Sequence, residues 1–324
     1  ATLMGAITSL QLRAMTPEQI ESLSATQIGA IPCTALKGMT ATQCAVLSST
    51  QLAAFSCSQI PYLTPEAMAA LDESQLSALS STQFATLTTA QIKKLQSTQL
   101  ASLPATLLNA LSSTQCGALY TSQICHLTPT QISQMTSTQL SGLASSHISA
   151  LTGTQFAAFT ETQMAFLTAN QFSGLTSTDI SEISASQIGI FNQTQIAALS
   201  YTAVSELSDP QLASLSTTLI AALTSKQISA ISTLQLAALT TDQIAALSTT
   251  GIKGLSRPSV AALSTTQIMA LSQSQISALT TSQASAISAD QIQVMNATQI
   301  QGFSAPDIMA MTATTIMGKI GRAH

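Results

Sequence analysis

The sequence is poor in charged and aromatic side chains. Only 7% of its 324 residues are charged and 3% are aromatic, and Trp is absent. Disordered chains usually combine high net charge with few apolar residues, whereas globular domains carry about a quarter charged residues. Here 45% of the residues are apolar. The composition therefore favours a folded chain with a buried core and an almost uncharged surface.

Basic residues are too scattered for two common kinds of partner. The net charge is −4, and the nine Lys and Arg stand singly apart from Lys93 and Lys94. Proteins that bind nucleic acid need clustered basic residues to displace counterions, and an anionic membrane surface demands a similar cluster. We therefore expect no nucleic acid partner and no attachment to a charged membrane surface.

Long apolar runs and an export signal are also missing. A membrane helix needs roughly 18 consecutive apolar residues, but Ser, Thr and Gln interrupt this sequence every eight residues. We expect no membrane insertion. No signal peptide is visible. The chain opens in the middle of a repeat unit, with Met4 and Ile7 at apolar positions, so we expect it to be a segment of a longer protein.

What the chain has in abundance is one eight-residue repeat. The unit is Ser/Thr-x-x-Gln-Ile/Leu-x-small-Leu, numbered here 1 to 8, and residues 232–248 contain two clear copies. Position 1 falls on multiples of eight from Thr8 to Thr312, which gives 39 units in register, with a partial unit at 1–7 and a tail at 320–324. Position 5 is apolar in all 39 units, position 8 in 38, and position 4 is Gln in 28. The repeat predicts a single continuous solenoid over residues 1–324.

The spacing of the apolar positions favours one short helix per unit. In a strand, positions 5 and 8 would point to opposite faces. In one continuous helix, eight residues turn through about 800°, so the apolar stripe would drift by about 80° per unit. An interrupted helix is left. We therefore predict an all-α solenoid of very short helices, one per eight-residue repeat, with a β-solenoid as the alternative.

Three features support short helices. Ser/Thr-x-x-Gln before an apolar residue is the capping-box pattern. Eight of the nine prolines lie at positions 1 to 3, where the first helical turn tolerates them. Acidic residues gather at positions 1 to 4 and basic residues at positions 6 to 8, as the helix dipole favours. Pro61 at position 6 is the exception, and we expect a local distortion there.

The same pattern assigns structural roles to two sets of residues. Positions 5 and 8 should be buried, and position 7 is small so that neighbouring helices can approach. Gln at position 4 should cap its own helix and could also form a ladder in which stacked amides bond coil to coil. The number of units per coil, whether two, three or four, stays open. We expect core roles for Ile20, Leu23, Ile228, Ile231, Ile244 and Leu247, and cap or ladder roles for Gln11, Gln19, Gln27, Gln227, Gln235 and Gln243.

The five cysteines have no metal or disulfide spacing. Cys44 and Cys116 replace the apolar residue at position 5, so we expect them to be small buried side chains. Cys33 and Cys57 share position 2 and lie three units apart. They can approach each other only if three units complete one coil.

No arrangement of residues predicts catalysis or a cofactor. His147 stands in for Gln at position 4, and we interpret it as a polar substitute in the same cap. His126 has no partner at ligand spacing and is interpreted as a surface histidine. Asp179 and Asp307 at position 4 can cap helices as carboxylates. There is no paired general acid and base, no nucleophile triad, and no phosphate-binding or metal-binding motif. We expect no cofactor, and we do not expect an enzyme.

The tandem unit Thr240–Leu247 (TTDQIAAL) resembles repeat tracts in very large bacterial proteins described as adhesin-like, haemagglutinin-like or haem-utilisation-like. The resemblance covers essentially the whole chain. It implies a secreted or surface-exposed structural tract and assigns no catalytic residue. No export signal or non-repeat anchor domain of the kind found in such proteins is recognisable in these 324 residues.

Three hypotheses for function follow. The first is a structural role, as a rigid spacer or a self-assembling fibre subunit of a bacterial surface or extracellular structure, with copies associating head to tail or laterally. The second is a solenoid binding module for a protein or glycan partner, such as a host or cell-surface ligand. The third is ice binding by a regular Thr/Ser array, against which counts the use of the position-1 hydroxyl in capping. We place the structural role first.

Overall fold

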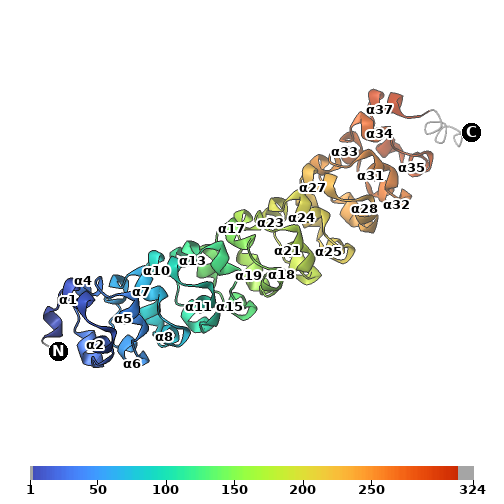
Figure 1. The fold of residues 1–324 in the computed structure, drawn as a ribbon. Helices are drawn as coiled ribbons and strands as arrows, with labels where there is room; N and C mark the ends of the chain where they lie inside the picture. Colours follow the sequence, from blue (N-terminus) through green and yellow to red (C-terminus); the bar gives the residue numbers. More distant parts are fainter. Residues whose placement is uncertain (1–2, 313–324) are drawn as a thin grey trace, which may run out of the picture. The chain divides into compact units, whose positions relative to one another are not determined.

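The computed structural model describes residues 3–312, and all regular elements in this range are helical (Figure 1). There are 37 α-helices of four to six residues and two 3-10 helices, η1 and η2, and the described residues contain no strand. The prediction of an all-α solenoid is confirmed, and the β-solenoid alternative is wrong. The chain divides into two compact units, Ala1–Phe166 and Leu167–His324, which are described separately.

The first unit holds twenty-one helices, each falling in one repeat. Their bounds are η1 Met4–Ala6, α1 Ser9–Ala14, α2 Pro17–Glu21, α3 Ala25–Gly29, α4 Cys33–Leu36, α5 Ala41–Ala45, α6 Ser49–Ala53, η2 Ile60–Tyr62, α7 Pro65–Ala69, α8 Glu73–Ser77, α9 Ser81–Phe84, α10 Thr89–Lys94, α11 Ser97–Ser102, α12 Ala105–Leu108, α13 Ser113–Ala118, α14 Thr121–Ile124, α15 Pro129–Ser133, α16 Ser137–Ser141, α17 Ser145–Ile148, α18 Gly153–Ala157 and α19 Glu161–Phe166.

The described part of the second unit continues the same pattern. Its helices are α20 Ala169–Phe172, α21 Ser177–Glu182, α22 Ala185–Gly189, α23 Gln193–Ala198, α24 Tyr201–Ser205, α25 Asp209–Ser214, α26 Thr217–Ala222, α27 Ser225–Ala230, α28 Thr233–Ala238, α29 Thr241–Ala245, α30 Thr249–Ile252, α31 Arg257–Ala262, α32 Thr265–Ala270, α33 Gln273–Ser277, α34 Thr281–Ala284, α35 Ala289–Val294, α36 Ala297–Ile300 and α37 Ala305–Ala310.

Two extended residues form each corner between helices. After α28 the chain leaves the helix at Leu239 (φ −69°, ψ 138°) and stays extended at Thr240 (φ −69°, ψ 161°), which is already the N-cap of α29. The described residues contain no positive φ angle, so the corners need no glycine. Because position 8 ends one helix and position 1 caps the next, consecutive helices are joined with no linker.

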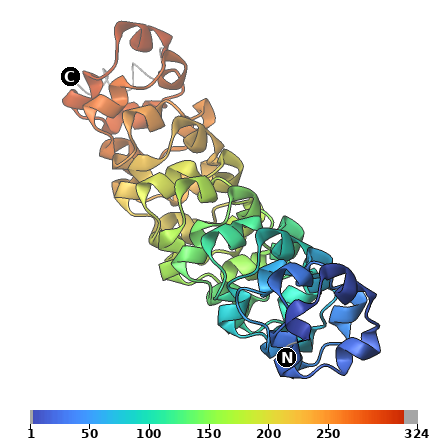
Figure 2. The ribbon, with the colours of Figure 1, turned by 90° about the vertical axis from the view of Figure 1, so that its left-hand side faces the viewer.

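In both compact units, three eight-residue repeats complete one coil. In the first unit α1 packs on α4, α2 on α5 and α10 on α13, and in the second unit α20 packs on α23, α24 on α27 and α34 on α37. The stacked helices α1 and α4 begin at Ser9 and Cys33, which are 33 − 9 = 24 residues apart. Figure 2 shows helices of successive coils lying over one another within each unit. The structure thus decides between the two, three or four units per coil that the repeat allowed.

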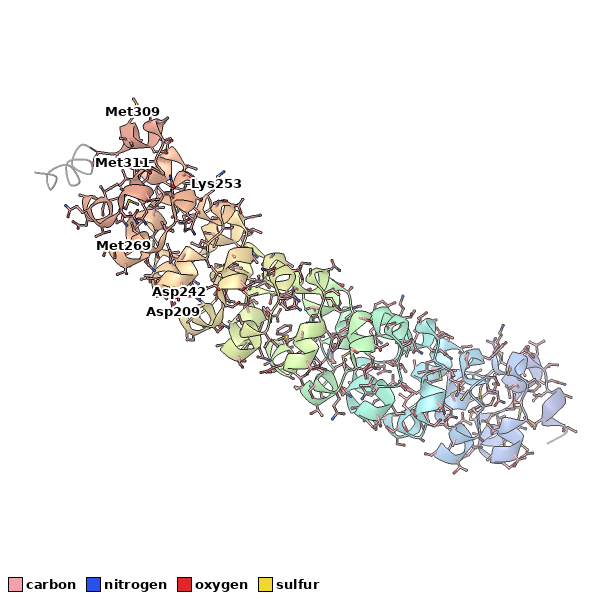
Figure 3. The ribbon with its side chains drawn as sticks, turned by 180° about the vertical axis from the view of Figure 1, so that it is seen from behind. Asp209, Asp242, Lys253, Met269, Met309 and Met311 are labelled. Carbon is pink, nitrogen blue, oxygen red and sulfur yellow. The ribbon has the colours of Figure 1, made fainter. Side chains whose placement is uncertain are left out.

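The core lies inside the coils and is built from positions 4, 5 and 8. Residues 48–55 show the usual pattern: positions 1, 2, 3 and 6 are exposed, position 7 is half-buried, and Gln51, Leu52 and Phe55 are buried. Long side chains such as Met309 and Lys253 lie on the outside (Figure 3). Because the Gln side chain at position 4 is buried beside the two apolar side chains, it lies where neighbouring coils meet.

Small residues at position 7 permit the close contact of stacked helices. A Cβ atom added to Gly254 would lie 2.1 Å from the carbonyl oxygen of Ser225, which occupies position 2 one coil earlier. The same approach recurs at Gly38, where the distance to the Ser9 oxygen would be 1.9 Å. The expectation that position 7 controls helix spacing is therefore supported by the backbone contacts at these two glycines.

The distortion expected at Pro61 is confirmed. This unit forms the 3-10 helix η2 in place of an α-helix, because Pro61 has no amide hydrogen to donate. The hydroxyl of Ser56 lies 2.9 Å from that of Ser58. Gln59 still accepts from the Ser56 amide (2.7 Å), so half of the cap survives.

Candidate functional site: the glutamine network

The glutamine at position 4 completes the cap of its own helix. In α29 the amide of Thr240 donates to Oε1 of Gln243 (2.9 Å), and the amide of Gln243 donates to Oγ1 of Thr240 (3.2 Å). These reciprocal bonds satisfy two amides that the first helical turn leaves without partners. The side chain is held in one orientation, with its Nε2 group directed away from the cap.

The same glutamine bonds to the coil before it. Nε2 of Gln243 donates to the carbonyl oxygens of Leu212 (2.8 Å) and Leu215 (2.9 Å), which lie 31 and 28 residues earlier. These are positions 5 and 8 of one repeat, where the helix ends and its carbonyl oxygens can accept from donors outside the helix. One amide group therefore caps the start of one helix and the end of another.

This pair of contacts recurs in both units at the same offsets of 28 and 31 residues. It is made by Gln43, Gln51, Gln59, Gln75, Gln83, Gln91, Gln123, Gln131, Gln155 and Gln163 in the first compact unit and by Gln211, Gln227, Gln267, Gln275, Gln283, Gln291 and Gln299 in the second. The described residues contain no buried side-chain nitrogen or oxygen without a hydrogen bond. The network differs from the expected ladder of stacked amides, because each of these glutamines donates to main-chain carbonyls of the preceding coil.

The six glutamines chosen from the sequence fall into two groups. Gln227 and Gln243 are buried, and Gln235 is half-buried but reaches the carbonyls of Ser205 (2.9 Å) and Leu207 (2.7 Å). Gln11 and Gln19 are exposed and Gln27 is half-buried. The Oε1 atoms of these last three accept from the N-cap amides of Thr8, Thr16 and Ser24. The hydrogen bonds of these three side chains in the structure are those of the local cap.

Five of the six proposed core residues are buried. Ile20, Ile228, Ile231, Ile244 and Leu247 are at most 4% exposed. Leu23 differs: it is half-buried, so its assignment to the core needs correction. The helix of its repeat, α2, packs on α5 of the following coil.

His147 reproduces both functions of glutamine. Its Nδ1 accepts from the amide of Ala144 (3.0 Å), and its Nε2 lies 3.0 Å from the carbonyl oxygen of Leu119. The first contact requires Nδ1 to be unprotonated, so the hydrogen of the neutral ring is on Nε2 and is donated to Leu119. The interpretation of His147 as a substitute in the cap is confirmed.

The two aspartates at position 4 keep the cap and lose the donor. Oδ2 of Asp179 accepts from the amide and the hydroxyl of Thr176, both at 2.8 Å, and burial raises the pKa of this carboxyl despite those bonds. Asp307 also suffers desolvation, but hydrogen bonds from Ser304 and from the hydroxyl of Thr281 (2.9 Å) outweigh it and lower its pKa. A carboxylate at position 4 can therefore accept from a neighbouring coil but cannot donate to it.

The cysteines divide by burial. Cys44 and Cys116 are 1% exposed, as expected for position 5, and desolvation raises the pKa of each thiol to about 12. Cys33 is half-buried and Cys57 is exposed. Cys125 lies next to His126, which is exposed, with 3.3 Å between Sγ and Nδ1. Nδ1 is also 2.8 Å from the carbonyl oxygen of Ser122, to which it donates, so it is not available as a base for the thiol.

Each of the three tyrosines has a lysine of the adjacent coil over its ring, a pairing that the eight-residue repeat does not indicate. The Nζ atoms of Lys37, Lys93 and Lys226 lie 5.6, 5.8 and 4.5 Å from the ring centroids of Tyr62, Tyr120 and Tyr201. Cation–π contacts of this kind contribute about 0.5–1 kcal/mol at exposed sites. The signal in the sequence was the spacing of 25 to 27 residues, which has meaning only once the coil length is known.

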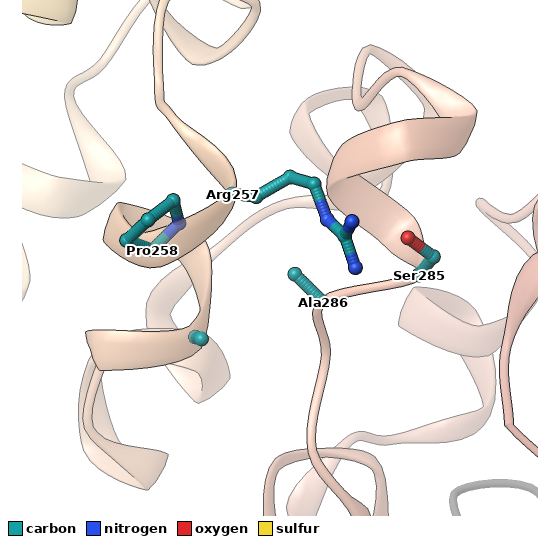
Figure 4. A pocket seen from close by; sticks show the side chains of 5 residues that line it. Arg257, Pro258, Ser285 and Ala286 are labelled. Atoms are coloured by element: carbon teal, nitrogen blue, oxygen red, sulfur yellow. The ribbon is translucent and has the colours of Figure 1, made fainter.

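Shallow grooves lie between stacked helices. One of them, of about 600 Å³, is lined by Arg257, Pro258 and Ala261 of α31 and by Ser285 and Ala286 of the following coil (Figure 4). A second groove, of about 380 Å³, contains Lys93, Lys94 and Tyr120. In the described range, no three His, Cys, Asp or Glu side chains come together as a metal site would require. No described helix has the length and apolarity needed to span a membrane.

Comparison with known proteins identifies a repeat in the second unit. Residues 212–249 and 220–257 match the ALTTAQ repeat. The two matches begin 220 − 212 = 8 residues apart, one repeat of this chain. With one change, the six letters of that name occur here as residues 238–243 (ALTTDQ). The match supports a tandem repeat. No curated protein matches the chain.

Proposed function

We propose that this chain is a non-enzymatic structural repeat protein, a rigid spacer or a self-assembling fibre subunit of a bacterial surface or extracellular structure. The observation that carries the proposal is the glutamine network. In both compact units, a buried side chain at position 4 of many repeats ties the start of a helix to the main chain of the preceding coil. Such bonds fix the separation of coils independently of the variable surface residues.

The surface supports the same proposal. Positions 1, 2, 3 and 6 carry mainly Ser, Thr and Ala, and the described residues contain one ion pair, Lys94 to Glu66 at 3.4 Å. The resemblance to repeat tracts of large bacterial proteins favours a location outside the cell. A neutral exterior rich in hydroxyl groups suits a spacer, because its surface residues can vary while the separation of its coils stays constant.

Rigidity is the property to test. Thr82 and Thr154 are exposed, and each occupies position 3 of its repeat in the first compact unit. They lie 154 − 82 = 72 residues apart, which is three coils. Spin labels attached at these two positions, with the native cysteines replaced by Ser or Ala, should give one narrow distance distribution by pulsed electron resonance. A broad distribution would overturn the spacer function. Light scattering of the unlabelled chain over a range of concentrations separates a monomeric spacer from a fibre subunit.

One observation favours a binding module as the second candidate. The groove that contains Lys93, Lys94 and Tyr120 combines positive charge with an aromatic ring that is 53% exposed. These groups suit an acidic protein or glycan. A glycan array read at physiological salt tests this candidate, with Lys93→Ala and Lys94→Ala as the variants that should lose binding.

A further inference from the structure

Cys33 and Cys57 occupy equivalent places on stacked coils of the first unit. Both lie at position 2, and 57 − 33 = 24 residues separate them, the length of one coil. Sγ of Cys33 lies 3.6 Å from the carbonyl oxygen of Ser58, the residue that follows Cys57. The condition under which these two thiols can approach each other, three units per coil, is met.

The other cysteines are poor partners for this pair. Cys44 and Cys116 are buried at position 5, and their raised pKa values keep them as thiols. Cys125 lies 125 − 57 = 68 residues after Cys57, which is not a whole number of coils, so it belongs to a different stack of helices. Among the thiols that solvent reaches, only Cys33 and Cys57 are stacked.

The repeat that carries Cys57 forms a short 3-10 helix in place of an α-helix. A disulfide needs Cα atoms within about 4.4–6.8 Å, and packed helices usually have axes 8–10 Å apart, so the segment around Cys57 must close on Cys33. Pro61 reduces this repeat to the 3-10 helix η2, and the Ser56 hydroxyl contacts that of Ser58. Residues 57–59 therefore lie outside any helix, and a small shift costs few hydrogen bonds.

Contacts on both sides keep the two coils in register during such a shift. Gln59 donates to the carbonyl oxygen of Ile31 (2.8 Å), and Lys37 lies over the ring of Tyr62. We propose that Cys33 and Cys57 form a disulfide that links two consecutive coils under oxidising conditions. This inference goes beyond the structural function and does not depend on it.

The chemistry is thiol–disulfide exchange with a small-molecule disulfide such as oxidised glutathione. The thiolate of exposed Cys57 attacks one glutathione sulfur, forms a mixed disulfide and releases one glutathione thiolate. The thiolate of Cys33 then attacks the Cys57 sulfur and releases the second glutathione. Two protein thiols are oxidised and one glutathione disulfide is reduced to two thiols, so that electrons and protons balance.

The experiment is peptide mapping of the full chain after incubation with oxidised glutathione at low protein concentration, without reductant. We expect a peptide pair joined through Cys33 and Cys57, absent from Cys57→Ser and retained in Cys125→Ser. Serine fits position 2 without strain, since Ser81 and Ser97 occupy it elsewhere. Oxidation should also raise the melting temperature of the wild-type chain, with full reversal by dithiothreitol and no change in Cys57→Ser.

Other results would overturn the proposal. Separate glutathione adducts on Cys33 and Cys57, with no linked pair, would show that the coils do not close. A linked pair formed equally well in guanidinium chloride would show that chain proximity, not the stacking of coils, brings the thiols together. Links through Cys125 in place of Cys33 would exclude the assignment as well.

Discussion

A single amide at position 4 makes two kinds of contact, and each uses one of its two atoms. Oε1 of Gln243 serves the local cap, while Nε2 serves the carbonyls of Leu212 and Leu215. Glutamate has the same length and keeps an oxygen for the cap but has no donor. A Gln→Glu substitution replaces Nε2 by oxygen, so it removes the contact between coils and keeps an acceptor for the cap.

We expect Gln243→Glu to lower the free energy of unfolding by about 2–3 kcal/mol at pH 7, because a buried carboxylate oxygen would face two carbonyl oxygens. The measurement is urea denaturation followed by circular dichroism. Gln11→Glu is the matched control: Gln11 is exposed and bonds within its own cap, so its substitution should change stability by less than about 0.5 kcal/mol. Equal losses in the two variants would show that the cap alone matters.

The buried carboxyl of Asp179 should make stability depend on pH. Burial raises its pKa in the folded state, so the fold prefers the protonated form. The favourable contribution is fully present below the pKa of the unfolded chain and is lost as pH rises through the folded pKa. We expect Asp179→Asn, which cannot ionise, to be more stable than the wild type by about 1 kcal/mol at pH 7.

That advantage of Asp179→Asn should vanish near pH 3, where the wild-type carboxyl is also neutral. Thermal melts of both proteins across this range measure it. A constant difference at all pH values would mean that the effect comes from packing and not from charge. Asp307→Asn should show no such gain at pH 7, because hydrogen bonds lower the pKa of Asp307.

At the scale of the helix, the spacing of stacked elements depends on side-chain size at a few points. Gly254 faces the carbonyl of Ser225 so closely that an added Cβ would lie 2.1 Å away, whereas a Cβ on Gly189 would lie 3.6 Å from the nearest atom, the Ser214 oxygen. We expect Gly254→Ala to destabilise the chain by about 1–3 kcal/mol. Gly189→Ala lies in α22, has room, and should stabilise by up to about 1 kcal/mol. Opposite signs in urea melts would support this account, and equal effects would contradict it.

The helices themselves could be predicted from local chemistry. Thr240 and Gln243 form a capping box, Pro61 interrupts a helix, and Ile244 and Leu247 are buried, because each of these depends on residues within one repeat. The number of repeats per coil could not be predicted. It depends on how short helices meet at corners, and nothing within eight residues records it. The contacts of Gln243 with Leu212 and of Lys226 with Tyr201 stayed hidden for the same reason.

At the scale of the whole molecule, we expect that one complete coil can be removed without disturbing the fold. Removal of residues 208–231 takes out three repeats and joins Leu207 to Ser232 with the register intact. The residues 28 and 31 positions before Gln235 would then be Ile183 and Ile180, whose carbonyls now bind Gln211. Gln235 would then face two carbonyl oxygens at positions 5 and 8 of a repeat, so we expect the shortened chain to fold.

Removal of only residues 208–219 is the matched test. This deletion joins Leu207 to Ile220, and the residues 28 and 31 positions before Gln235 become Gln195 and Asn192, at the start of a helix rather than its end. The first turn of a helix offers amides, which cannot accept from Nε2. We expect the 24-residue deletion to keep the wild-type ellipticity per residue and a cooperative melt, and the 12-residue deletion to lose helix and aggregate. If both variants melted alike, coil-to-coil bonding by glutamine would not be what holds the repeats in register.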